Sequence, residues 1–183
     1  MSRGRSFRLL LICGSLRNGS TNAALLQSAG TIAADAGLAA SSYDALASLP
    51  HFNPDDDHEP LDPFVADLRG QIAAADALLF CTPEYAGALP GSFKNLLDWT
   101  VGGGETYGKP VAWVNVSTGA DDAHDSLRKV LQRTGTDIVE AACVRIPVTR
   151  KEVDAAGTIH DEAIRAQVAA VIDALARHVD RFD

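Results

Sequence analysis

The sequence predicts an α/β fold with a five-stranded parallel sheet and helices on both of its faces. Two observations carry this prediction: short apolar runs alternate with longer segments of helical periodicity along all 183 residues, and each connection is long enough for a crossover helix. Crossovers between neighbouring parallel strands are right-handed. Because no second unit or internal repeat interrupts the alternation, we expect a single domain over residues 1–183.

The first predicted strand is the apolar run FRLLLIC at residues 7–13. Apolar residues between Leu25 and Ala36 then recur at helical spacing, and Gly37 ends this helix. A weaker run at residues 41–46 predicts an edge strand.

The third predicted strand is the run ADALLFCTP at residues 75–83, which follows a helix whose apolar stripe extends from Val65 to Ile72. Because the run is continuously apolar, we expect both faces of this strand to be covered. The stretch NPDDDHEPLDP at residues 53–63 precedes that helix, and we interpret it as a surface loop.

The second half of the chain continues the alternation. A helix begins at Pro90, a residue that a helix start tolerates, and its apolar stripe extends to Val101. The run KPVAWVNVS at residues 109–117 predicts the fourth strand, and DIVEAACVRI at residues 137–146 predicts the fifth. Apolar residues at helical spacing indicate a helix between these strands and a long terminal helix: Leu127, Val130 and Leu131, then Ile164, Val168, Val171, Ile172 and Leu175.

The composition excludes two classes of partner. The chain has 16 Lys and Arg against 24 Asp and Glu, a formal charge of -8 with no basic cluster, and this balance repels nucleic acids and anionic membranes. Each of Cys13, Cys81 and Cys143 lies in an apolar run, so we expect reduced core residues. The run LLLIC is shorter than the apolar region of a signal peptide, and we therefore expect a cytoplasmic protein.

A polar segment, GSLRNGSTN, follows the first strand at residues 14–22. Ligands of an open parallel sheet bind beyond the carboxyl ends of its strands. Backbone N–H groups, a helix N-terminus and polar side chains can donate to an anion here, and Arg17 adds a fixed charge. The set suits a terminal phosphomonoester, because Ser20 stands where a triphosphate-binding loop needs Lys. The alternative is a polar turn that only caps the helix.

Three motifs occur in order along the chain: GSxRxxSxN at residues 14–22, PEY at residues 83–85, and PGxxKNxxDW at residues 90–99. Their combination resembles the NADPH-dependent FMN reductase family, and the likeness extends from residue 7 to the helix near Leu131. The resemblance implies a flavodoxin-like fold that holds FMN.

The resemblance also implies which residues bind the cofactor. The phosphate is expected on the loop after the first strand, at Ser15, Arg17, Ser20, Thr21 and Asn22. The flavin ring is expected along the loop after the third strand, at Pro83, Glu84, Tyr85, Ala86 and Gly87. The pyrimidine end of the ring is expected near Ser117, Thr118 and Gly119. Tyr85 offers an aromatic surface for stacking or for a partner subunit; the alternative is an ordinary strand-ending turn with a half-buried Tyr85.

The sequence departs from the family in two places. Many members carry Asn where this chain has Ala86, so one side-chain contact to the flavin or substrate pocket is expected to be missing. A glycine-rich turn is usual after the fourth strand, whereas this chain retains Gly119 and inserts Asp121 and Asp122.

The resemblance implies an oxidoreductase that passes hydride from NADPH or NADH, via FMN, to a quinone, free flavin or similar small-molecule acceptor. Because the cofactor does the chemistry, no catalytic acid, base or nucleophile is assigned. Two alternatives stay open: a flavodoxin-type electron carrier, which is not an enzyme, and a flavin-free interaction module. The apolar helix from Pro90 and the Tyr85 loop also predict a homodimer or homotetramer.

Other polar groups are predicted to have no role in the chemistry. We interpret DDDHE at residues 55–59 as a solvated acidic loop and not as a metal site. VGGGETYGKP at residues 101–110 lacks the spacing of a dinucleotide fingerprint and predicts a flexible loop. His124, His160 and His178 are expected at the surface.

Overall fold

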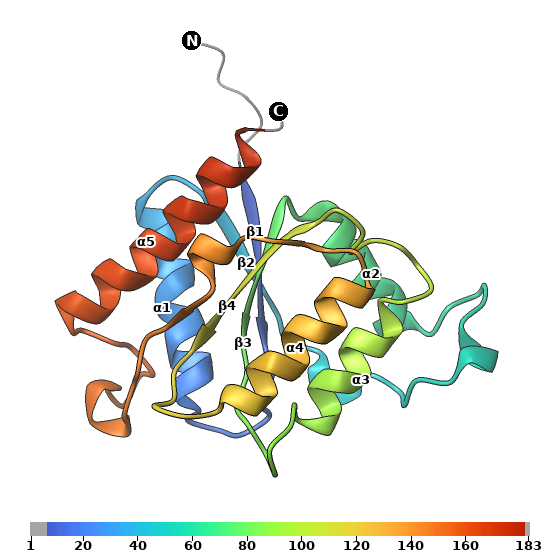
Figure 1. Ribbon diagram of the computed structural model, residues 1–183, viewed down its shortest axis with the longest axis horizontal. Helices are drawn as coiled ribbons and strands as arrows, with labels where there is room; N and C mark the ends of the chain where they lie inside the picture. The colour runs from blue at the N-terminus through green and yellow to red at the C-terminus, as the bar shows by residue number, and fades with distance from the viewer. Residues whose placement is uncertain (1–6, 182–183) are drawn as a thin grey trace.

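The computed structural model describes residues 7–181, and within them a parallel sheet has the strand order β2-β1-β3-β4-β5 (Figure 1). A sixth short strand, β6, also pairs with β4. The strands are β1 (Arg8–Cys13), β2 (Ala39–Tyr43), β3 (Ala77–Cys81), β4 (Pro110–Asn115), β5 (Asp137–Ile138) and β6 (Val144–Arg145). The predicted α/β class and parallel sheet are confirmed, and the strand order is that of the flavodoxin-like fold.

Helices cover both faces of the sheet, as predicted (Figure 1). α1 and α5 pack on one face, and α2, α3 and α4 pack on the other. The helices are α1 (Thr21–Asp35), α2 (Pro63–Ala74), α3 (Gly91–Trp99), α4 (Asp121–Arg133) and α5 (Glu162–Val179). Within residues 7–181, no helix has both the length and the apolar character needed to cross a membrane.

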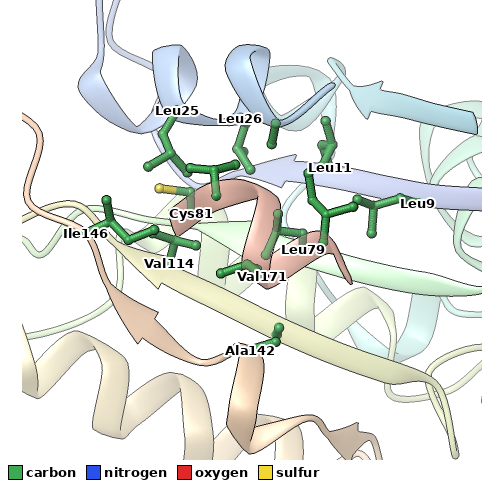
Figure 2. Close-up of a cluster of buried hydrophobic side chains, with 14 of the residues drawn as sticks. Leu9, Leu11, Leu25, Leu26, Leu79, Cys81, Val114, Ala142, Ile146 and Val171 are labelled. Atoms are coloured by element: carbon green, nitrogen blue, oxygen red, sulfur yellow. The ribbon is translucent and has the colours of Figure 1, made fainter. Parts of the chain in front are cut away.

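The interiors of the central strands are apolar on both faces because each of these strands contributes to two cores. Leu9 and Leu11 of β1 face α1 and α5, whereas Leu10 and Ile12 face the opposite core. Figure 2 shows the first core, where β1, β3 and β4 meet side chains of α1 together with Val171 of α5. This double burial fixes the register of the strands, because side chains alternate between the two faces of a sheet.

The fifth strand is not continuous, so the prediction for residues 137–146 is wrong in detail. β5 and β6 are separated by a 3-10 turn at Glu140–Ala142. The turn carries Glu140 out of the sheet, where its carboxylate forms a two-pronged ion pair with the Arg128 guanidinium of α4. Both short strands are only partly buried, and within the described residues each pairs with β4 alone.

Two predicted boundaries also shift. The edge strand is Ala39–Tyr43 rather than residues 41–46, and Leu46 lies in a short 3-10 turn. α3 ends at Trp99, so Val101 lies outside the helix and its side chain is 63% exposed. The carbonyl oxygen of Trp99 accepts hydrogen bonds from Nε and Nη2 of Arg69 at 3.0 and 2.8 Å, which satisfies this helix end without a further turn.

Arg69 also corrects the interpretation of the acidic loop. Its buried guanidinium pairs with Asp57 at 2.8 Å, from the acidic segment, and lies 3.9 Å from Glu105, from the glycine-rich segment. Asp57 is therefore an anchoring residue and not part of a solvated acidic run. Within residues 7–181, no group of three or more His, Cys, Asp or Glu side chains is arranged to hold a metal ion.

Candidate functional site

A cavity of about 520 Å³ opens at the carboxyl ends of β1, β3 and β4, within the size range of small-molecule and cofactor sites. Most predicted binding residues line it: Ser15, Arg17, Ser20, Thr21, Asn22, Pro83, Glu84, Tyr85 and Ser117. Four others do not: Ala86, Gly87, Thr118 and Gly119. Three segments that are distant in the sequence therefore meet at one cavity, as the parallel topology requires.

The loop after β1 leads directly into the N-terminus of α1. Ser20 is the N-cap residue, and its Oγ accepts hydrogen bonds from the backbone N–H of Asn22 at 3.2 Å and from Asn22 Nδ2 at 3.4 Å. Arg17 is exposed, and its backbone N–H donates to Ser15 Oγ at 3.3 Å. A helix N-terminus with hydroxyls and a cation beside it forms an anion-binding surface.

Gly14 fastens this loop to the sheet. Its N–H donates to the carbonyl oxygen of Cys81 at 2.9 Å. A Cβ at this position would lie 2.2 Å from Thr82 Oγ1, so only glycine lets the loop pass this close to β3.

The loop after β3 forms a tight two-residue hairpin turn. Tyr85 and Ala88 exchange backbone hydrogen bonds of 3.0 and 3.1 Å, and the two central residues, Ala86 and Gly87, have φ of 52° and 70°. This is the pattern of a type I′ turn, which prefers Asn followed by Gly. The turn directs Ala86 and Gly87 away from the cavity and leaves Tyr85, 53% exposed, at its rim.

Glu84 links the same loop to α4. Its Oε2 accepts a hydrogen bond from the backbone N–H of Ala123 at 3.0 Å. A carboxylate at a helix N-terminus satisfies a free N–H group and interacts favourably with the helix dipole. Part of the hydrogen-bonding capacity of Glu84 is therefore used within the protein.

Asn115, at the end of β4, shapes the third segment. Its Oδ1 accepts from the Ser117 N–H at 2.9 Å and its Nδ2 donates to the Gly119 carbonyl oxygen at 2.8 Å. Arg145 donates to the Thr118 carbonyl oxygen at 2.6 Å and pairs with Asp121. Thr118 and Gly119 thus make contacts within the protein, and the charge of the inserted Asp121 is compensated.

His124 is buried beneath this segment, so its predicted surface position is wrong. It is 7% exposed, and Nδ1 lies 2.7 Å from the carbonyl oxygen of Ala120. Burial lowers the pKa of His124 below its usual value, and the positive charge of Arg145 lowers it further, although the Ala120 carbonyl opposes the shift. The neutral ring then donates from Nδ1, and Nε2 has no hydrogen-bond partner within the described residues.

The cavity also includes residues that the sequence motifs did not indicate: Thr82, Asn115, Val116, Ala120, Val148, Thr149 and Arg150. The last three lie there because the Val148 N–H donates to the Val116 carbonyl oxygen at 2.9 Å, which continues the pairing beyond β6. The TRKE pattern of a capping box at Thr149 is visible in the sequence. It predicts the turn but not its approach to the cavity, which depends on this long-range pairing.

Two cations contribute to the charge of the cavity. Arg17 and Arg150 both line it, and both are exposed. Among residues 7–181, neither guanidinium has an ion-pair partner. Their donors are available to an anionic ligand.

Comparison with known proteins places this geometry in context. The model of a family described as NADPH-dependent FMN reductase matches residues 7–148. An NAD(P)H-dependent FMN reductase of Pseudomonas aeruginosa is 34% identical over 180 residues, covering 96% of each chain. A 2-hydroxy-1,4-benzoquinone reductase of a Burkholderia species is 32% identical, covering 95% of this chain and 97% of the relative. The solved structure of FerB, a flavoenzyme NAD(P)H:(acceptor) oxidoreductase of Paracoccus denitrificans, is 28% identical with a TM-score of 0.80, covering 94% of this chain and 98% of that chain.

Proposed function

The chain belongs to the NADPH-dependent FMN reductase family, and we propose from this premise that its cavity binds FMN and that it transfers reducing equivalents from NAD(P)H to a quinone, free flavin or similar small acceptor. The family and its named relatives support an oxidoreductase over a flavodoxin-type electron carrier.

The observation that carries this proposal is the anion-binding surface at the start of α1. The N-terminus of α1, the hydroxyls of Ser20 and Thr21 and the exposed guanidinium of Arg17 meet at the cavity. A terminal phosphate has several oxygens to satisfy, and this donor set matches that need. The residues present therefore fit the phosphate end of FMN.

FMN, when bound, would supply the hydride chemistry, accepting two electrons from a nicotinamide and passing them on. The chain's own residues bind and orient it. The phosphate would be held by Ser15, Arg17, Ser20, Thr21 and Asn22, with Arg150 adding a second positive charge at the cavity. The ring end would be held by the hairpin after β3, at Pro83, Glu84 and Tyr85, and by Ser117.

No side chain at this site is assigned as a catalytic acid, base or nucleophile. Glu84 and Asn115 make contacts that hold their loops in place, and Arg17 and Arg150 offer hydrogen-bond donors that suit an anion. The role that we propose for the protein is to fix the phosphate and to shape the loops around the ring.

The experiment that tests this function begins with the visible spectrum of the purified protein and the identification of its extracted flavin. Anaerobic mixing with NADPH, and separately with NADH, should bleach the flavin absorbance before an acceptor is added, and a quinone should restore it. Adenine-containing FAD as the sole native flavin would contradict the proposed phosphate site. An electron carrier would leave both nicotinamides unoxidised.

We further propose that residues 1–183 form one FMN-binding domain that acts in the cytoplasm as a homodimer or homotetramer. The apolar run at residues 9–13 lies inside β1, between β2 and β3, which supports a core strand over a leader segment. Tyr85 is 53% exposed beside the cavity, which supports a partner subunit at this end of the sheet. Light scattering that returned a 19.3 kDa monomer at micromolar concentration would contradict the oligomer.

A further inference from the structure

A buried thiol at the end of β3 contacts a side chain of the proposed phosphate site. Cys81, the last residue of β3, is 0% exposed, and its Sγ donates a hydrogen bond to Oδ1 of Asn22 at 3.2 Å. Asn22 lies in the first turn of α1, is 6% exposed and lines the cavity. Figure 2 shows Cys81 on the face of the sheet that α1 covers.

This hydrogen bond determines which way the Asn22 carboxamide faces. With Oδ1 engaged by the thiol, Nδ2 is on the other side of the group, 3.4 Å from Ser20 Oγ. A flipped amide would place its NH2 group against sulfur, which is a weak acceptor. The flip would also turn a carbonyl oxygen, rather than a donor, toward the side of the amide that Ser20 occupies.

The thiol is suited to act as a lasting donor. Burial raises the pKa of Cys81 well above its usual value, and the neighbouring Cys13 raises it further, so the group stays protonated. Cys13 pairs in register with Cys81, yet its own Sγ lies 3.7 Å from the Ser15 carbonyl oxygen. Cys81 is therefore the cysteine whose thiol contacts a side chain of the cavity.

We propose that Cys81 is a positioning residue for the cofactor phosphate, because its thiol holds the Asn22 carboxamide with Nδ2 available to the phosphate oxygens. This inference rests on the proposed function, since it assumes that the loop after β1 binds the phosphate of FMN. It adds a residue from the end of β3 that does not itself line the cavity.

The test compares FMN with riboflavin, which has the same ring but no phosphate. Binding of each to the apoprotein is followed by quenching of flavin fluorescence. For Cys81→Ala, the dissociation constant for FMN should rise about threefold to tenfold, the range for losing one hydrogen bond, whereas riboflavin should change less than about twofold. Cys81→Ser keeps a donor and should restore FMN binding to within about twofold of the original protein.

Two further variants separate positioning from packing. In an Asn22→Ala background, Cys81→Ala should weaken FMN no further, because the group that the thiol orients is gone. Cys143→Ala is the matched control, since it removes a partly buried cysteine that does not line this cavity, and it should leave the ratio of FMN to riboflavin affinity unchanged. If Cys81→Ala does not fold, Cys81→Val replaces it as a variant of similar size that has no donor.

The outcomes are distinct. The positioning role is supported if Cys81→Ala or Cys81→Val lowers the preference for FMN over riboflavin and Cys81→Ser restores it. In the Asn22→Ala background, the same Cys81 substitution must cause no further loss of FMN affinity. Equal losses for FMN and riboflavin, or a Ser variant that behaves like the Ala variant, would overturn it while the proposed function stands. If the unaltered protein bound neither flavin, the proposed function itself would fail, and the inference with it.

Discussion

The carboxylate of Glu84 accepts a hydrogen bond from the backbone N–H of Ala123 at 3.0 Å, which joins the hairpin after β3 to the first turn of α4. The two residues are separated by 39 positions in the chain, so this contact depends on the fold. The hairpin carries Tyr85 to the rim of the cavity, and its position therefore depends on a helix cap.

Removing this cap should loosen the proposed ring end of the site. We expect Glu84→Ala to weaken FMN and riboflavin equally, by about twofold to thirtyfold, since losing a helix-cap acceptor costs about 0.5–2 kcal/mol. Glu84→Gln retains an acceptor oxygen and should lose less. Fluorescence titration of both flavins measures this, with Asp125→Ala, an exposed residue of the same helix, as the control. A loss confined to FMN would show that Glu84 acts on the phosphate end instead.

Arg17, unlike Glu84, should contribute to the binding of FMN but not of riboflavin. We expect Arg17→Ala to weaken FMN by about 1.5–3 kcal/mol, the range for a charge-assisted hydrogen bond, and to leave riboflavin almost unchanged. Arg133→Ala removes an exposed arginine at the far end of α4 and controls for net charge. Equal losses for the two flavins would mean that Arg17 does not bind the phosphate.

Ala86 occupies a backbone conformation that suits Asn better. With φ of 52° at the first central position of a type I′ turn, it lies in the left-handed region that Asn tolerates and other L-residues avoid. We expect Ala86→Asn to stabilise the protein by about 0.5–1 kcal/mol, measured by urea unfolding. Ala88→Asn, outside the two central positions of the turn, should bring no such gain. If both substitutions were neutral, strain at Ala86 would not limit stability.

The sequence predicted the parts of this molecule that depend on neighbouring residues. The central strands were predicted because both cores select apolar side chains at successive positions, as in Leu79 and Phe80. The loop after β1 was predicted to face the ligand-binding edge because its polar residues directly follow a buried strand. Ala86 stands where many family members carry Asn. Its positive φ gives a local physical reason for Asn at this position.

The parts that were missed depend on partners distant in the chain. The break in the fifth strand places Glu140 against Arg128, and the end of α3 depends on Arg69, from α2. Val148 reaches the cavity through its pairing with Val116. None of these pairings has a periodic signal, because each joins single residues from different elements.

Asp57 and Asp55 belong to the same acidic run but should differ in their contribution to stability. Asp57 pairs with the buried Arg69 at 2.8 Å, whereas Asp55 is exposed. Removing Asp57 leaves the buried guanidinium with the more distant Glu105 carboxylate, at 3.9 Å, so Asp57→Asn should cost about 3 kcal/mol of unfolding free energy. Asp55→Asn should cost less than about 0.5 kcal/mol. Urea unfolding of the two variants measures the difference, and similar values would show that the ion pair contributes little.

Burial of neutral His124 should make the stability of the protein dependent on pH. Its pKa in the folded state is lowered, chiefly by burial, whereas an unfolded His titrates near pH 6.5. Below about pH 6.5 the unfolded chain therefore binds the proton more readily, and stability falls as the pH falls, by at most about 1.4 kcal/mol per pH unit for one group. Above that pH both states are neutral and the contribution is constant.

His124→Gln should flatten urea-unfolding free energies between about pH 5 and pH 6.5, whereas His51→Gln, at an exposed histidine, should not. An unchanged pH profile in His124→Gln would mean that another group causes the acid sensitivity.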